Sequence, residues 1–177
     1  IPQQHYAEAE TLLRQTLAIR PIRTDGWIEL GNALALQKKY TEALDCFATA
    51  LEQDPGNGQI FLKRGKVLAH LNRHEEAIAS YGAGLALDPS DGMIHHELAL
   101  ELVAVGQMDA AGEEFRKAAQ LSQGSVAVRF DYGTWLLRQR QWPEAQREFQ
   151  AVLQMEPGNT RAQKHLAWLQ AKLSDNH

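Results

Sequence analysis

The 177-residue sequence holds a single cysteine, Cys46, so no disulfide can form within one chain. It also contains no run of about 18 apolar residues, the length that a membrane-spanning helix requires. We therefore expect no direct membrane insertion. No signal peptide is visible, but the sequence begins at Ile1 rather than at a methionine. Cytoplasmic and periplasmic locations therefore both stay open.

An excess of basic residues is absent as well. The chain carries 18 Lys and Arg against 22 Asp and Glu, a formal net charge of −4. From Val126 onward there are seven basic and five acidic side chains, so the last part is about +2 and the first 125 residues are about −6. Because nucleic-acid binding relies on a basic stripe, this balance argues against a nucleic-acid partner.

The signatures of catalysis are missing too. The sequence has no Gly-x-Ser-x-Gly, phosphate loop or dinucleotide fingerprint. His70 and His74 stand four residues apart and His95 adjoins His96, but neither pair has a third metal ligand at a suitable spacing. We therefore expect no enzymatic activity, no cofactor and no metal, and we interpret Cys46 as an inert structural residue.

The sequence instead repeats itself every 34 residues. Within residues 24–57, Trp27, Leu30 and Leu34 recur at helical spacing, a second such pattern follows, and Pro55 ends it. The recurrence pairs small residues with large ones, as two closely packed helices require. The equivalent positions are Ala9, Ala43, Ala77, Ala111 and Ala145; Leu13, Phe47, Tyr81, Phe115 and Phe149; Gly31, Gly65, Ala99, Gly133 and Ala167; and Pro21, Pro55, Pro89 and Pro157, with Gln123 in place of a fifth proline.

The pattern Trp27-x2-Leu30-Gly31, followed by Ala43-x3-Phe47 and Pro55, resembles the tetratricopeptide repeat (TPR) family. The resemblance covers essentially the whole chain. It implies an all-α, right-handed superhelix of antiparallel helix pairs.

The period divides the chain into six segments. Residues 1–23 form the second helix of a partial repeat, which we interpret as part of a longer protein, with a natural N-terminal cap helix as the alternative. Repeats follow at 24–57, 58–91, 92–125 and 126–159, and residues 160–177 form a capping helix or a truncated repeat. Repeat 92–125 departs furthest from the pattern, with Gly106 in its turn and Gly112 inside its second helix. In repeat 58–91, Arg64 replaces the leucine found at Leu30.

A helix advances about 100° per residue, so repeat positions 2, 5, 9, 12 and 13 lie opposite the packing residues. In the TPR family this arc lines a concave groove that binds peptides or helices. The resemblance therefore implies a partner-binding groove made of Ile28, Asn32, Leu62, Lys66, His96, Leu100, Val103, Phe130, Thr134, Leu137, Arg138, Arg161, Lys164 and Trp168.

These residues combine an apolar track with cations, which concentrate toward the C-terminus. We expect a protein or peptide partner with apolar anchors and an acidic portion. The alternative is that neighbouring helices cover some of these side chains. The predicted function is a protein–protein interaction scaffold. Two alternatives stay open: a regulatory or targeting arm of a larger enzyme or secretion or assembly protein, and self-association through the terminal helices.

Overall fold

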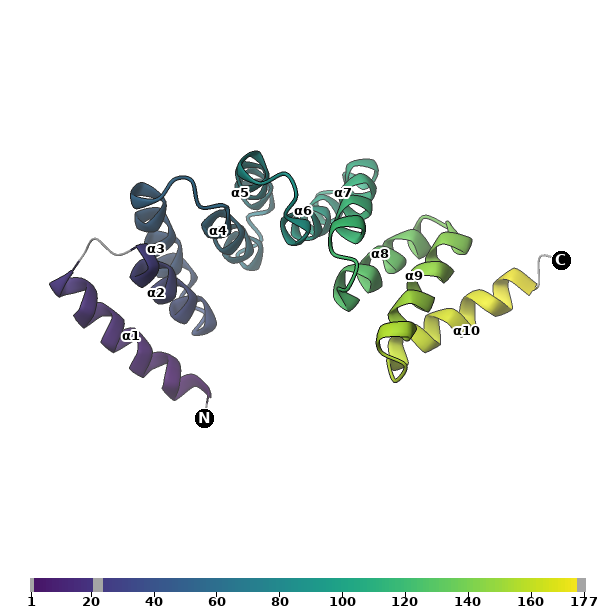
Figure 1. The fold of residues 1–177 in the computed structure, drawn as a ribbon, viewed down its shortest axis with the longest axis horizontal. Helices are drawn as coiled ribbons and strands as arrows, with labels where there is room; N and C mark the ends of the chain where they lie inside the picture. The colour runs from purple at the N-terminus through teal and green to yellow at the C-terminus, as the bar shows by residue number, and fades with distance from the viewer. Residues whose placement is uncertain (1, 21–23, 175–177) are drawn as a thin grey trace. The chain divides into compact units, whose positions relative to one another are not determined.

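The computed structural model describes residues 2–20 and 24–174, in which the chain forms ten α-helices and no strand. Their bounds are α1 Pro2–Ile19, α2 Thr24–Leu36, α3 Tyr40–Gln53, α4 Gly58–His70, α5 His74–Leu87, α6 Gly92–Ala104, α7 Met108–Leu121, α8 Val126–Arg138, α9 Trp142–Met155 and α10 Thr160–Ser174 (Figure 1). The expected all-α repeat fold is confirmed. Pro21, Ile1 and residues 175–177 of the predicted segments lie outside the described residues.

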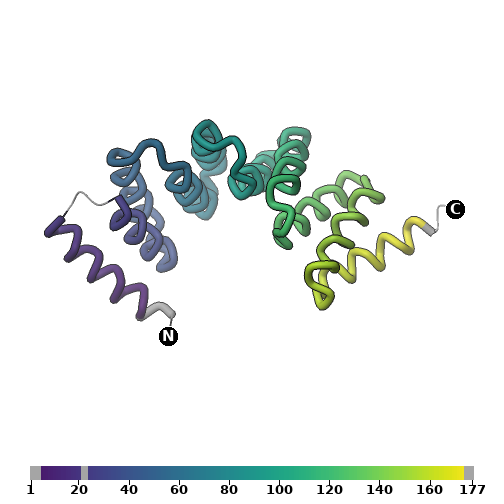
Figure 2. Tube along the Cα trace, in the orientation of Figure 1, coloured from purple at the N-terminus to yellow at the C-terminus, as the bar shows by residue number. Residues whose placement is uncertain are grey.

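The helices pair as the 34-residue period predicts. Helices begin at residues 24, 58, 92, 126 and 160, and α2–α3, α4–α5, α6–α7 and α8–α9 each form an antiparallel hairpin (Figure 2). The chain divides into two compact units, the first ending at Ser90 and the second beginning at Asp91. This division lies one residue before the boundary between repeats 58–91 and 92–125. None of the described helices is long and apolar enough to cross a membrane.

Local residue choices explain where the helices begin. The side chain of Asn57 accepts a hydrogen bond from the Gln59 amide at the start of α4, and Asp91 accepts from the Met93 and Ile94 amides at the start of α6. Such caps satisfy amides that have no partner inside the helix. Pro143 lies in the first turn of α9, where its missing N–H is harmless.

The turns inside the hairpins share one backbone conformation. Lys38, Asn72, Gly106 and Arg140, each 34 residues apart, have φ values of 62°, 56°, 81° and 59°. Only Gly106 belongs to the residue type that adopts this left-handed region without cost. The glycine in the divergent repeat therefore preserves the turn. His74 is the first residue of α5.

Small residues inside the hairpins allow close helix packing. A Cβ atom added at Gly31 would lie 2.7 Å from Cε1 of the buried Phe47 ring. A Cβ at Gly112 would collide with the ring of Trp135. Gly112 is therefore a packing residue that admits a large side chain from α8, although the sequence pattern marks it only as a departure from the repeat.

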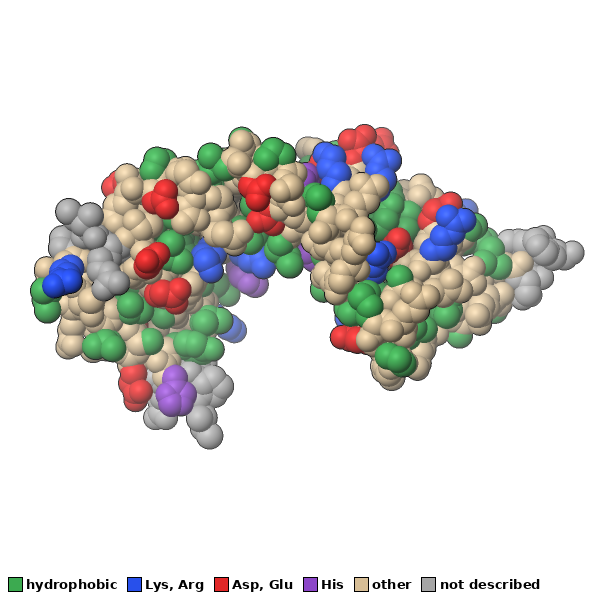
Figure 3. All heavy atoms as spheres, in the orientation of Figure 1, with side chains coloured by type: hydrophobic (Ala, Val, Ile, Leu, Met, Phe, Trp, Pro, Cys, Tyr) green, Lys and Arg blue, Asp and Glu red, His purple; other side chains and the backbone are tan. Residues whose placement is uncertain are grey.

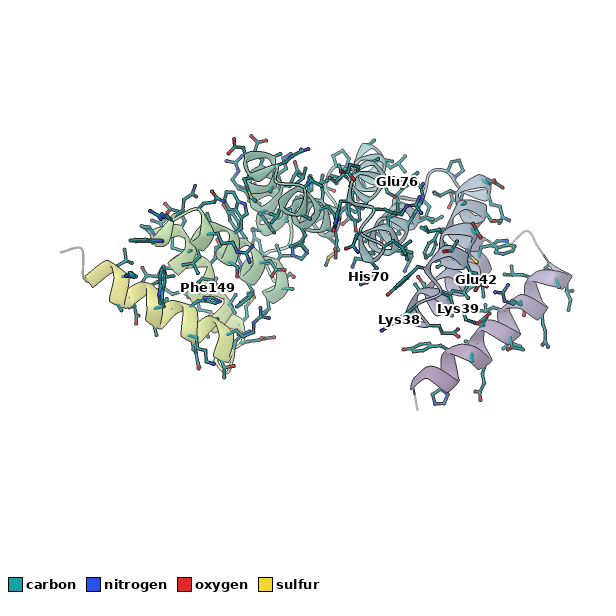
Figure 4. The ribbon with its side chains drawn as sticks, turned by 180° about the vertical axis from the view of Figure 1, so that it is seen from behind. Lys38, Lys39, Glu42, His70, Glu76 and Phe149 are labelled. Atoms are coloured by element: carbon teal, nitrogen blue, oxygen red, sulfur yellow. The ribbon has the colours of Figure 1, made fainter. Side chains whose placement is uncertain are left out.

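Polar contacts attach α1 to the first hairpin. Oε2 of Glu10 accepts hydrogen bonds from Lys39 Nζ at 2.8 Å and from Gln37 Nε2 at 3.0 Å, and Oε1 accepts one from Arg14 Nε at 3.0 Å. Arg14 also donates to Glu42 at 2.6 Å. Figure 4 shows Lys39, which precedes α3, and Glu42 of α3 on the side toward α1. These contacts supplement the burial of Leu17 against the core of the first unit.

Candidate partner-binding site

The first unit contains an open cleft of ≈ 470 Å³ lined by side chains from α2, α3 and α4. Exposed or half-buried residues of α2 and α4 form most of its wall, with Phe47 of α3 and Val67 beneath them. In Figure 3, Lys, Arg and His side chains gather beside hydrophobic ones at the edge of α4. The lining residues are Glu29, Asn32, Ala35, Leu36, Phe47, Lys63, Lys66, Val67 and His70.

The cleft joins apolar surface to positive charge. Leu36, the last residue of α2, is 57% exposed. Lys63 and Lys66 come from the middle of α4, and Glu29 adds one carboxylate from α2. His70 ends α4, and its ring stacks on Tyr40 with centroids 5.5 Å apart. This stacking restrains the imidazole at one end of the cleft.

The sequence predicted part of this cleft. Of the four groove residues expected in the first unit, Asn32 and Lys66 line it. Ile28 is half-buried and packs against the core, and Leu62 is buried. Glu29 and Lys63, which were not among the expected groove residues, also line the cleft. Both stand at repeat position 6, which lies only about 20° around the helix from the selected position 13.

In the second unit, two of the expected groove residues are buried rather than open. His96 is 5% exposed and Phe130 is 6% exposed. Nε2 of His96 lies 2.9 Å from Oδ2 of Asp131 on α8, so this side chain links two neighbouring helices. The adjacent His95 pairs with Glu114 of α7. Both histidines therefore serve packing between helices, and no group of three metal-ligating side chains occurs within residues 2–20 and 24–174.

Phe130 forms the centre of an aromatic cluster between α8, α9 and α10. Its ring centroid lies 5.6 Å from that of Phe149 and 5.7 Å from that of His165. The guanidinium of Arg161 lies 4.3 Å from the Phe130 ring centroid, a cation–π geometry. Burial, together with the charge of Arg161, lowers the pKa of His165. Figure 4 shows Phe149 between α9 and α10.

The other expected residues of the second unit keep more accessible surface. Leu100, Val103, Thr134 and Leu137 are half-buried, and the Thr134 hydroxyl donates to the Phe130 carbonyl at 2.9 Å. Arg138, Arg161 and Lys164 are exposed. Trp168 is 46% exposed and meets the edge of Trp142, with ring centroids 6.3 Å apart. The second unit therefore presents cations and apolar side chains around a closed aromatic cluster.

Comparisons with known proteins agree with this architecture. Three family models, each described as tetratricopeptide repeat, match residues 24–57, 62–126 and 102–169. A comparison with curated protein sequences finds no significant match.

Several solved structures share the fold at low sequence identity. PilF of Pseudomonas aeruginosa is 19% identical with a TM-score of 0.81, over 99% of this chain and 86% of its own. YrrB, a TPR protein with an unusual peptide-binding site, is 22% identical with a TM-score of 0.74, over 92% and 84%. MamA of Desulfovibrio magneticus is 21% identical with a TM-score of 0.76, over 87% of each chain. From its repeat pattern, its helix hairpins and the three matching models, the chain belongs to the tetratricopeptide repeat family of protein–protein interaction modules.

Proposed function

We propose that the cleft of the first unit binds a peptide or helix of a partner protein that has apolar anchors and an acidic portion. The observation that carries the proposal is the ≈ 470 Å³ cleft that places exposed Leu36 beside Lys63 and Lys66. Removal of the apolar surface from water would supply affinity, and the lysines would orient acidic groups and speed encounter. The peptide-binding site of YrrB is a precedent on the same fold.

The second unit adds charge of the same sign. Arg138, Arg161 and Lys164 are exposed there, with half-buried Leu100, Val103 and Leu137 as apolar surface. A partner segment that binds at the second unit would meet Arg138, Arg161 and Lys164 there. We therefore expect binding to weaken as the salt concentration rises. Dissolved ions screen the attraction between the exposed cations of this chain and an approaching acidic partner, over a distance of about 10 Å at 0.1 M salt.

The test uses an array of twelve-residue peptides in which leucine and glutamate positions vary, each matched by a copy with glutamine in place of glutamate. We expect Lys63→Glu to weaken binding of the acidic peptides about 5- to 30-fold, the effect of about 1–2 kcal/mol. Lys172→Glu, which makes the same charge change on exposed α10, is the control and leaves binding unchanged. The helical circular dichroism signal verifies the fold. Undiminished binding to Lys63→Glu would contradict the proposal.

Self-association is a second candidate because α1 carries an exposed apolar face. Leu12 is 65% exposed and Ile19 is 80% exposed, and both line an open, mostly apolar depression on α1. Light scattering over a concentration series measures the mass. A mass that rises with concentration in the parent chain and stays constant in a Leu12→Lys, Ile19→Lys variant would support it, and a constant monomer mass in the parent would exclude it.

A further inference from the structure

Arg64 departs from the repeat in a way that folding does not explain. The same position holds an apolar side chain in the other four helices of this register: Leu30, Leu98, Tyr132 and Leu166. Arg64 is half-buried, and among the residues that the structure describes its guanidinium makes no hydrogen bond or ion pair. Because a partly dehydrated charge without a partner is unfavourable, packing alone would favour leucine at this position.

The side chain of Arg64 lines a second cleft of the first unit. This cleft has a volume of ≈ 240 Å³, and Thr41, Leu44, Asp45 and Ala48 of α3 form one wall. Arg64 and Leu68 of α4, with Arg73 before α5, form the other. None of these residues lines the cleft that contains Lys63 and Lys66. The two clefts can therefore be altered independently.

The two arginines of this cleft differ in their bonding. Nε and Nη2 of Arg73 donate to the two carboxylate oxygens of Glu76 at 2.6 and 2.7 Å. These hydrogen bonds lower the pKa of Glu76. Arg64 lowers that pKa as well, but only through its charge and without a hydrogen bond. The guanidinium of Arg73 is thus already engaged, whereas the donors of Arg64 stay available to a ligand.

The size and charge of the cleft restrict what it can hold. Pockets for small molecules and cofactors usually measure about 300–1,000 Å³, so ≈ 240 Å³ suits one or two side chains of a peptide. Leu44, Ala48 and Leu68 offer apolar contact. Asp45 on the facing wall would repel a phosphate dianion more strongly than a single carboxylate, and it can accept a hydrogen bond from a peptide N–H.

We propose that this cleft is a separate docking site for a glutamate side chain, and the aliphatic residue beside it, in a segment of another protein. Arg64 receives the carboxylate through paired N–H donors, the leucines and Ala48 contact the aliphatic side chain, and Asp45 accepts from the partner's backbone. In this arrangement Arg64 serves recognition rather than helix packing.

The test is a titration of the isotope-labelled chain with the blocked tripeptide Leu-Glu-Leu, followed by NMR. We expect a saturable shift of the Arg64 Nε–H signal and of the Leu44 and Ala48 amides, and no such shift with Leu-Gln-Leu. Arg64→Leu abolishes the amide shifts and raises the melting temperature by about 2–4 °C, a shift typical of a modest gain in a chain of this size. Arg64→Lys, which keeps the charge but not the fork of donors, binds more weakly than the parent.

Three results would overturn the proposal: no saturable shift, equal shifts with the glutamine peptide or with inorganic phosphate, or a lower melting temperature for Arg64→Leu. The last would mean that the arginine supports the fold. Lys63→Glu serves as the matched control because it alters only the other cleft. It leaves this titration unchanged, so failure here and failure of the proposed function are separate outcomes.

Discussion

Two glycines of the first unit provide a direct test of how tightly its hairpins are packed. Gly31 lies inside α2 and Gly82 inside α5, so alanine should favour the helix at both positions by about 1 kcal/mol. At Gly82 a Cβ atom would meet nothing within 4 Å, whereas at Gly31 it would lie 2.7 and 2.9 Å from two ring atoms of Phe47. Alanine therefore gives the same gain in helix propensity at both positions, but only at Gly31 does its Cβ atom clash with a side chain of another helix.

The cost at Gly31 follows from the position of the ring. Phe47 is 1% exposed, so its ring cannot turn into solvent to make room. Overpacking of a well-packed core typically costs about 1–3 kcal/mol, which offsets the helical gain or exceeds it. We expect Gly82→Ala to be about 1 kcal/mol more stable than the parent, and Gly31→Ala to range from unchanged to about 2 kcal/mol less stable.

Thermal and urea unfolding, followed by circular dichroism at 222 nm, measure both variants. For a chain of this length Gly82→Ala should melt about 2–4 °C higher. A double-mutant cycle with Phe47→Leu, the residue type present at Leu13, isolates the contact. Gly31→Ala should become less costly in that background because the ring is gone. Equal stabilisation by Gly31→Ala and Gly82→Ala in the parent would refute the close approach of α2 and α3.

Three further predictions concern single side chains. Hydrogen bonding, foremost from Lys39, lowers the pKa of Glu10 to about 2 from an ordinary value of 4.5. The contribution of the Glu10 carboxylate to the stability of α1 is therefore complete above pH 4.5 and is lost as the pH falls toward 2. Hydrogen exchange in α1 should show this pH dependence, and Glu10→Gln should remove it. Burial raises the pKa of the Cys46 thiol to about 11. A thiol reagent at pH 8 should therefore modify the native chain at least about a hundredfold more slowly than the urea-unfolded chain. Rapid labelling of the native chain would contradict this. Asp91→Ala removes two cap hydrogen bonds of 2.9 and 3.0 Å from the start of α6. It should lower the free energy of unfolding, measured in urea, by about 1 kcal/mol. Ser125→Ala removes one longer hydrogen bond of 3.4 Å at the start of α8 and should lower this free energy less.

Periodicity predicted the helices because local spacing is enough to define an amphipathic face. The 34-residue interval, the proline after α3 and the small and large residues at Gly31 and Phe47 all describe contacts within one hairpin, and such contacts depend on residues close in sequence. YrrB shares the fold at only 22% sequence identity. The fold therefore tolerates wide sequence variation.

The accessible surface required the tertiary structure because it depends on how a neighbouring repeat covers each side chain. Leu62, His96 and Phe130 occupy positions on the predicted open arc, yet each is buried. An angle around one helix cannot reveal that Asp131 approaches His96 from the next hairpin, or that Arg161 and His165 close over Phe130.

The sequence by itself thus determined the all-α repeat fold, since 34-residue spacing and helical periodicity are local properties of the chain. Only the tertiary structure decided that Lys63, Glu29 and Asn32 line one cleft and that Arg64 lines a second one. It also decided that Gly112 leaves space for the ring of Trp135. Each of these depends on the distance and rotation between helices packed from different repeats, which side-chain volumes set collectively.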